Sequence, residues 1–151
     1  MRSSFLTVIL LTLAGCGGGL KTVKPGEIQG TAIRLPDGTT IMAETMRHEM
    51  DVRRGMMFRD SLPEGRGMLF VHGSPGMYAY WMYQVKIPLD IVWLDANRRI
   101  VEISPNTPPC PSKSARECPN FGGAQTSLYV LELPAGAVQK HGLKTGDRLL
   151  F

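Results

Sequence analysis

The sequence predicts a mostly β fold, a jelly-roll-like sandwich or partly closed barrel with one or two short helices. Short apolar or alternating runs recur along the chain, and turns rich in Gly, Pro, Asp or Asn separate them at regular spacing. Only two stretches have helical spacing instead. A length of 151 residues, 43% of them hydrophobic, fits one globular domain preceded by a targeting segment.

The N-terminus resembles a bacterial lipoprotein signal. A basic start at Met1-Arg2 precedes an apolar run over residues 5–13, which is too short to span a bilayer core that needs about 20 residues. Leu13-Ala14-Gly15-Cys16 then resembles a lipobox, in which the cysteine is diacylated. The alternative is an ordinary signal peptide in which Cys16 is a chance cysteine or a free thiol.

These features predict three segments and a location. We expect a signal peptide over 1–15, a lipidated cysteine and flexible tether over 16–30, and a single β domain over 31–151. Gly17 follows the cysteine without an acidic residue, which favours an outer membrane and a domain facing the periplasm. The formal charge is only +4, without a lysine or arginine run, so we expect no nucleic-acid partner and membrane contact through the lipid anchor alone.

Two further cysteines, Cys110 and Cys118, form an even pair in a segment rich in proline. An oxidising compartment favours a disulfide between them. The alternative is a redox or metal-binding pair, but the C-x₇-C spacing matches neither C-x-x-C nor a zinc motif, and no histidine is close in sequence.

The first elements of the domain are a hairpin and a helix. Predicted strands over 31–35 and 39–43 flank Pro36-Asp37-Gly38, a residue order typical of a tight turn. Residues 45–54 have helical spacing, and Gly55 can end the helix in a left-handed conformation.

The predicted centre of the fold is the strand over 89–94, which follows Pro88 and is apolar except for Asp90. The strands over 68–71 and 77–83 precede it, and that over 127–133 follows it later in the chain. The remaining predicted elements are a return strand over 99–103, a long excursion over 104–126, a helical turn over 135–141 and a last strand over 148–151.

A candidate polar cluster consists of Arg59, Asp90 and Glu132. A carboxylate at position 90, inside the most apolar strand, needs a cation or several N–H donors to stay ionised. Arg59 is the partner that we expect, with Glu132 as a third member. The cluster is either a buried ion pair that stabilises the fold or a polar anchor in a ligand pocket.

A candidate aromatic surface lies just before the central strand, at Tyr78, Tyr80, Trp81 and Tyr83. Such side chains can stack on a sugar or a peptide, so we expect a binding or interaction module at the cell envelope. The alternative is an envelope hydrolase in which Asp90 or Glu132 acts as a base. No catalytic signature is present, and three scattered histidines indicate neither a metal site nor a cofactor.

Several ordered motifs together resemble the domain of unknown function 192 family over residues 30–151. They are Gly55-Met56-Met57-Phe58-Arg59, Met68-Leu69-Phe70, Trp81-Met82, Pro88-Leu89-Asp90, Asp95, Pro109-Cys110, Leu131-Glu132-Leu133 with Gly136, and Gly146-Asp147. The resemblance implies a mostly β, jelly-roll-like domain, often exported, without an established activity or cofactor. This chain departs from the family at Tyr83-Gln84-Val85, where Lys-Asn-Thr is usual.

Overall fold

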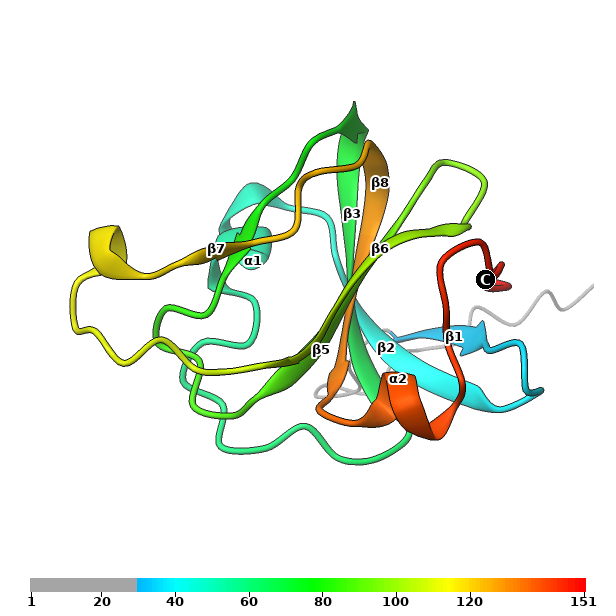
Figure 1. The fold of residues 1–151 in the computed structure, drawn as a ribbon, viewed down its shortest axis with the longest axis horizontal. Coiled ribbons are helices and arrows are strands. Elements are labelled where there is room, and N and C mark those ends of the chain that lie inside the picture. The colour runs from blue at the N-terminus through cyan, green and yellow to red at the C-terminus, as the bar shows by residue number, and fades with distance from the viewer. Residues whose placement is uncertain (1–29) are drawn as a thin grey trace, which may run out of the picture.

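The computed structural model describes residues 30–151, which fold around one six-stranded sheet (Figure 1). The strand order is β1-β2-β3-β8-β5-β6, and every neighbouring pair is antiparallel except β2 and β3. In that order the strands are Gly30–Arg34, Thr40–Met46, Arg66–Gly76, Ser127–Pro134, Leu89–Leu94 and Ile100–Thr107. The predicted signal peptide, Cys16 and all of the tether before Gly30 lie outside the described residues.

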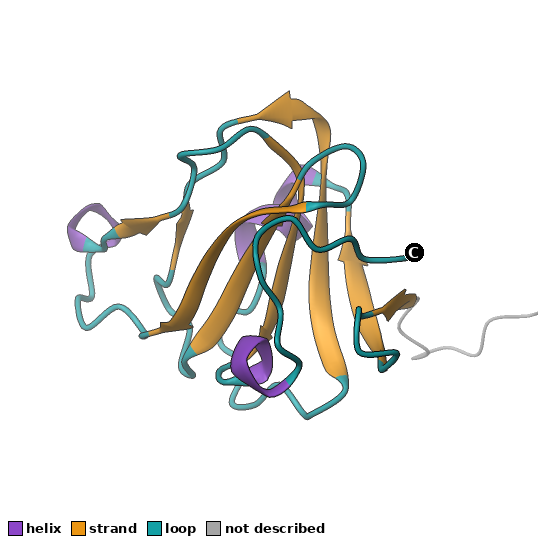
Figure 2. Cartoon of the chain, turned by 45° about the vertical axis from the view of Figure 1, so that its right-hand side comes forward, coloured by secondary structure: helices purple, strands orange, loops and turns teal. Residues whose placement is uncertain are grey.

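The other elements are small, which confirms the predicted mostly β class with short helices. A second sheet pairs β4 (Tyr80–Trp81) with β7 (Asn120–Phe121). The helices are α1 (Glu49–Arg54), the 3-10 turn η1 (Ala115–Glu117) and α2 (Ala137–Lys140). Figure 2 shows the large sheet as one curved layer, which does not close into a barrel.

The C-terminal segment connects the two edges of this sheet. Leu150 bridges Arg34 of β1, and Arg148 bridges Arg99 just before β6. The backbone N–H of Arg34 donates to the Leu150 carbonyl at 2.9 Å, and the N–H of Leu150 donates back at 3.1 Å. The predicted strand over 148–151 is therefore only a pair of isolated bridges, because the segment crosses from one edge to the other instead of following either.

Each face of the sheet buries its own apolar core. The first core lies on the side of α2 and the C-terminal segment, and its largest members are Ile33, Leu35, Ile41, Leu69, Val92, Leu94, Ile100, Leu131, Leu133, Leu143 and Leu149. The second core lies on the side of α1, and it contains Met56, Met68, Phe70, Met82, Val85, Leu89, Ile91, Trp93 and Val130. All six residues of β5 are buried, which confirms the predicted central strand.

Two predicted strands differ most in length from those of the structure. β3 continues past Val71 to Gly76 after a shift in register with β8, although we expected a loop there. The predicted strand over 77–83 is only the two-residue β4. Tyr78 is held by a side chain instead of a neighbouring strand, because Trp93 Nε1 donates to its carbonyl at 2.7 Å.

Candidate functional site

A pocket of about 160 Å³ opens on the α1 side of the sheet, next to the second core. All four residues of the predicted aromatic surface line it: Tyr78, Tyr80, Trp81 and Tyr83. We call this hollow the aromatic pocket. Its other main lining residues are Arg53, Arg54, Gly55, Met56, Met57, Phe70, His72, Val85 and Glu132.

One wall of the aromatic pocket is the end of α1. The helix ends at Gly55, whose φ of 43° lies in the left-handed region that favours glycine. A Cβ at this position would lie 3.2 Å from the Phe70 ring, so the glycine also lets the chain pass close to β3. The turn then inserts Met56 into the second core and leaves Arg54 exposed at the rim.

The inner tyrosines of the opposite wall are fixed by other aromatic rings. Tyr80 is edge-on to Phe70 and to Trp93, at centroid distances of 5.2 and 6.1 Å. Its hydroxyl lies 3.2 Å from Nε2 of His72, and the ring of His72 stacks on Tyr78 at 3.5 Å. Burial raises the pKa of Tyr80 above its ordinary range and lowers that of His72. Both side chains are therefore uncharged at neutral pH.

The outer aromatic residues form a more open part of the same wall. Trp81 is 41% exposed, and its ring centroid lies 5.8 Å from that of Tyr83 at a tilt of 48°. These two residues also border a shallow neighbouring hollow with Met50, Arg53, Arg54 and Met57. The pocket therefore offers exposed ring faces at its mouth and fixed rings further in.

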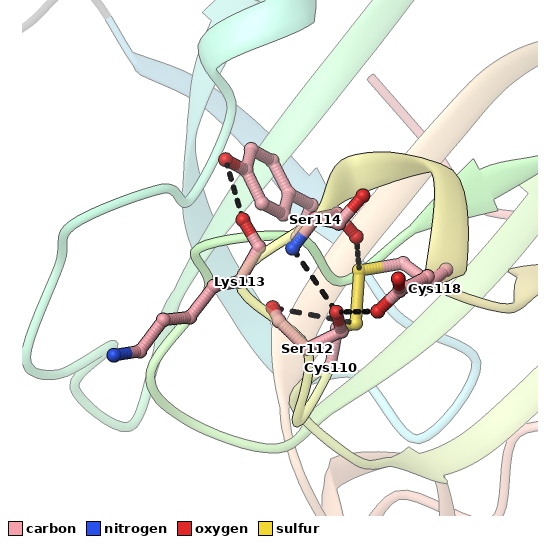
Figure 3. Close-up of a disulfide and its surroundings, with 7 residues drawn as sticks. Cys110, Ser112, Lys113, Ser114 and Cys118 are labelled. Carbon is pink, nitrogen blue, oxygen red and sulfur yellow. Dashed lines mark hydrogen bonds between the residues drawn. A yellow bond between two sulfur atoms is a disulfide. The ribbon is translucent and has the colours of Figure 1, made fainter.

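The loop that contains the disulfide is hydrogen-bonded to this wall and supports it (Figure 3). Cys110 and Cys118 are bonded, which confirms the predicted disulfide. The N–H of Cys110 donates to the Met82 carbonyl at 3.2 Å, and the Tyr83 hydroxyl donates to the Lys113 carbonyl at 3.4 Å. β7 follows directly and pairs with β4, so the long predicted excursion supports the aromatic wall.

Glu132 lies at the floor of the aromatic pocket. It faces the second core on β8, between Met68 of β3 and Ile91 of β5 in register, and only 4% of it is exposed. Its Oε2 atom is fully buried and has no hydrogen-bond partner among the described residues. Burial raises the pKa of Glu132 to about 8, although the charge of Arg59 acts in the opposite direction. The side chain is therefore mostly protonated at neutral pH and can donate a hydrogen bond.

The predicted pair between Arg59 and Asp90 is wrong. Arg59 instead makes a bidentate ion pair with Glu44 of β2, with N–O distances of 2.6 and 2.7 Å. Glu44 is itself buried, and its position on β2 brings it to the α1 side of the sheet. Because β2 and β3 pair in parallel across α1, no local sequence pattern connected this carboxylate with Arg59.

Asp90 lies on the opposite face of the sheet from Glu132. Along β5, Ile91 and Trp93 belong to the second core, so Asp90 points with Val92 toward the first core. Its carboxylate accepts N–H groups from Asn106 and Val138, both at 2.7 Å. Two backbone N–H donors therefore take the place of the cation that we expected beside Asp90. Arg59, Asp90 and Glu132 do not form a three-residue cluster.

Comparison with known proteins adds a family to this geometry. The model of a family described as "Uncharacterized ACR", DUF192, matches residues 32–151. The chain belongs to the DUF192 family. The resemblance predicted from the sequence is confirmed. No curated protein matches the chain significantly.

Two crystal structures of similar proteins share the fold of this chain. One is a protein of unknown function from Novosphingobium aromaticivorans DSM 12444, with 28% identity, a TM-score of 0.74, and coverage of 86% of this chain and 91% of that one. The other, from Sinorhizobium meliloti 1021, is named as a candidate transcription regulator. It has 28% identity, a TM-score of 0.72, and coverage of 82% of this chain and 94% of that one.

Four of the segments that carried the DUF192 resemblance contribute residues to the aromatic pocket. Gly55-Met56-Met57 lines one wall, Trp81 belongs to the other, and Glu132 is the floor. Arg54 and His72 also line the pocket, although the sequence analysis singled out neither. Their only sequence signal is proximity to these motifs, because spatial neighbours across α1 and β3 depend on packing.

Two features are absent from residues 30–151. This part of the chain contains no group of three or more His, Cys, Asp or Glu residues placed to hold a metal ion. It also contains no helix that is long and apolar enough to cross a bilayer.

Proposed function

We propose that this DUF192 domain is a binding module and that the aromatic pocket is its ligand site. The observation that carries the proposal is the position of Glu132. A buried carboxyl group with an unpartnered oxygen forms the floor of a pocket whose walls are aromatic. Leaving a buried polar atom without a partner costs free energy, and a bound ligand can supply the missing hydrogen bond.

The size of the pocket limits the ligand. A volume of about 160 Å³ corresponds to roughly five water molecules at about 30 Å³ each. It suits a single sugar ring or one peptide side chain, while the rest of the ligand extends along the exposed ring of Trp81. A sugar fits both chemistries, because its C–H faces stack on aromatic rings and its hydroxyls can pair with Glu132.

A hydrolase is the weaker candidate. Glycoside hydrolysis by the common mechanism needs two carboxyl groups across the scissile bond, about 5–10 Å apart. Within residues 30–151, Glu132 is the only carboxylic residue lining the pocket. Asp90 faces the first core, and Glu44 is occupied by Arg59. This distribution supports binding without turnover.

The proposal also includes a location. The lipobox-like Leu13-Ala14-Gly15-Cys16 and the glycine-rich residues after it favour a lipid anchor in the cell envelope. A domain tethered in this way, facing the periplasm, would meet envelope saccharides or peptides. The disulfide between Cys110 and Cys118 supports an oxidising compartment.

Screening of the purified protein against a glycan array and a peptide array tests the proposal. We expect saccharides to bind, and Trp81→Ala to weaken binding about tenfold or more, as removal of a central aromatic contact commonly does. Leu150→Ala is the control, because Leu150 is also apolar and 53% exposed but lies in the C-terminal segment. The proposal is contradicted if the protein binds to neither array, or if Trp81→Ala binds as tightly as the natural protein.

A further inference from the structure

The charges around the aromatic pocket are all of one sign. Arg53 and Arg54 line both the pocket and the shallow hollow beside it, and within residues 30–151 no aspartate lines either. Glu132, the single carboxylic residue of this described lining, is mostly protonated at neutral pH because burial raises its pKa. The binding surface is therefore cationic, although the formal charge of the whole chain is only +4.

The two arginines differ in their partners. Arg53 forms an exposed ion pair with Glu49 at 3.1 Å, one helical turn away. Among the described residues, Arg54 has no ion-pair partner within 4.0 Å, although Asp51 borders another hollow with it. Arg54 thus presents a guanidinium free for an anion at the rim, and it lines the same neighbouring hollow as Trp81.

The rim and the floor of the aromatic pocket together favour one class of ligand. The floor offers a hydrogen-bond donor in Glu132, the walls offer ring faces, and the rim offers a planar cation that can bind a carboxylate through two N–H groups. Arg54 would repel a cationic ligand, and the described lining has no ionised carboxylate that would offset this repulsion. A neutral sugar would leave Arg54 unused.

We infer that the aromatic pocket binds an acidic saccharide, with one sugar ring between the aromatic walls and its carboxylate paired with Arg54. The inference rests on the proposed function and adds the charge of the ligand to it. A ring hydroxyl accepts a hydrogen bond from the protonated carboxyl group of Glu132, which gives that buried group a hydrogen-bond partner.

Paired ligands that differ only in charge test the inference. The probes are oligogalacturonate and oligoglucuronate of four rings, each compared with its methyl ester, in calorimetric titrations of the full chain. We expect at least one acid to bind about tenfold or more tighter than its ester, as charge-assisted bonds typically allow. Arg54→Gln should remove that ratio, because it weakens binding of the acid far more than binding of the ester, and the tighter binding of the acid should weaken with added salt.

Three variants serve as controls. Arg148→Gln removes an exposed arginine of the C-terminal segment and should keep the full ratio of affinities. Glu132→Gln keeps a donor at the floor and should retain binding, whereas Glu132→Leu should lose it. Circular dichroism of each variant shows that the fold is intact.

The outcomes separate the inference from the proposed function. The inference of an acidic ligand is overturned if the acid and its ester bind equally, or if Arg54→Gln keeps the same ratio of the two affinities. Either result would still leave a saccharide-binding pocket. If acidic peptides bind and no saccharide does, the inference that the ligand is a saccharide is overturned. No binding of any saccharide or peptide overturns both.

Discussion

Two buried carboxyl groups of this domain show how differently the same chemical group can be accommodated. Asp90 is fully buried and accepts two backbone N–H groups, whereas Glu132 has a buried oxygen without a partner. Backbone donors favour an ionised carboxylate, and burial without them favours the protonated acid. Asp90 therefore belongs to the scaffold, and Glu132 is available to a ligand.

Glu132 predicts an unusual dependence of stability on pH. Its pKa is about 8 in the folded protein and near the ordinary 4.5 in the unfolded chain. Since the folded state holds the proton more tightly, this stabilising contribution is complete below pH 4.5 and is lost as the pH rises through about 8. Glu132→Gln should remove that loss.

Urea denaturation between pH 5 and 9 measures the effect. The free energy of unfolding of the natural protein should fall across this range by about 2–4 kcal/mol more than that of Glu132→Gln. Glu117→Gln is the control, because Glu117 is an exposed glutamate. Parallel curves for the natural protein and Glu132→Gln would contradict a raised pKa.

The sequence was sufficient to single out these residues but not to pair them. Asp90 and Glu132 are conspicuous as carboxylates in apolar strands, and alternation along β8 places Glu132 with Val130. Which face of β5 shares a core with Glu132 depends on the register between β5 and β8. That register is fixed by packing across a long excursion, so the expected contact with Arg59 could not be checked from spacing.

At the scale of elements, Asp90 joins three parts of the fold. The register of β5 and β6 shifts between Leu89 and Ile91, and Asn106, opposite this shift, has a φ of 48°. The Asp90 carboxylate binds the Asn106 N–H in this irregular stretch and the Val138 N–H in the first turn of α2. It thus stabilises a β-bulge and a helix start simultaneously.

Asp90→Ala should destabilise the domain by about 2–4 kcal/mol, because two buried N–H groups lose a charged acceptor. The loss should concentrate in α2 and the end of β6, which hydrogen exchange of their amides can detect. Asp60→Ala is the matched control, because Asp60 is exposed and pairs only with the exposed Lys86. Uniformly faster exchange, or no change in α2, would argue against this linking role.

Gly122, directly after β7, lies against Trp93 of β5. Its φ is 65°, and an added Cβ would lie 2.2 Å from Cζ2 of Trp93. Gly38 is a natural comparison, because its φ is 88° but a Cβ there would contact nothing within 4 Å. The pair separates the cost of a left-handed backbone from the cost of a clash.

Gly38→Ala should cost about 1 kcal/mol from backbone strain alone. Gly122→Ala should cost about 2 kcal/mol more, because Trp93 or β7 must move. Tryptophan fluorescence should shift only in Gly122→Ala, since Trp93 is fully buried in the natural protein. Equal stability losses in the two variants would show that the loop can retreat from Trp93 without strain.

The elements that could be predicted from the sequence are those whose contacts are local in the chain. The hairpin of β1 and β2 around Gly38 was predicted because its turn chemistry is local. The parallel pairing of β2 with β3, and the small sheet of β4 and β7, join segments that lie apart in the chain. Neither pattern has a local signal, so the support that β7 gives the aromatic wall emerged only from the structure.

At the scale of the whole molecule, the six-stranded sheet separates structural from candidate functional residues. The first core, with α2 and the C-terminal segment, contains Asp90 and is held by bridges to both sheet edges. The second core forms the base of the aromatic pocket, whose walls come from α1 and from the braced loop. Figure 1 shows α1 and α2 at different sides of the sheet, in agreement with these contacts.

The proposed ligand site would act at the cell envelope only if the protein is retained there. Leu13-Ala14-Gly15-Cys16 predicts that Cys16 is lipidated, and more than one acyl chain, at about 0.8 kcal/mol for each buried CH₂, gives a lasting anchor. Cys16→Ser should move the protein from the membrane fraction to the soluble fraction while leaving its folded domain and ligand affinity unchanged. Mass spectrometry of the natural protein should find diacylated Cys16 as its first residue. Gly17→Ser is the control that keeps the cysteine, and an unacylated mature N-terminus in the natural protein would reject the anchor without affecting the pocket, because the two depend on separate parts of the chain.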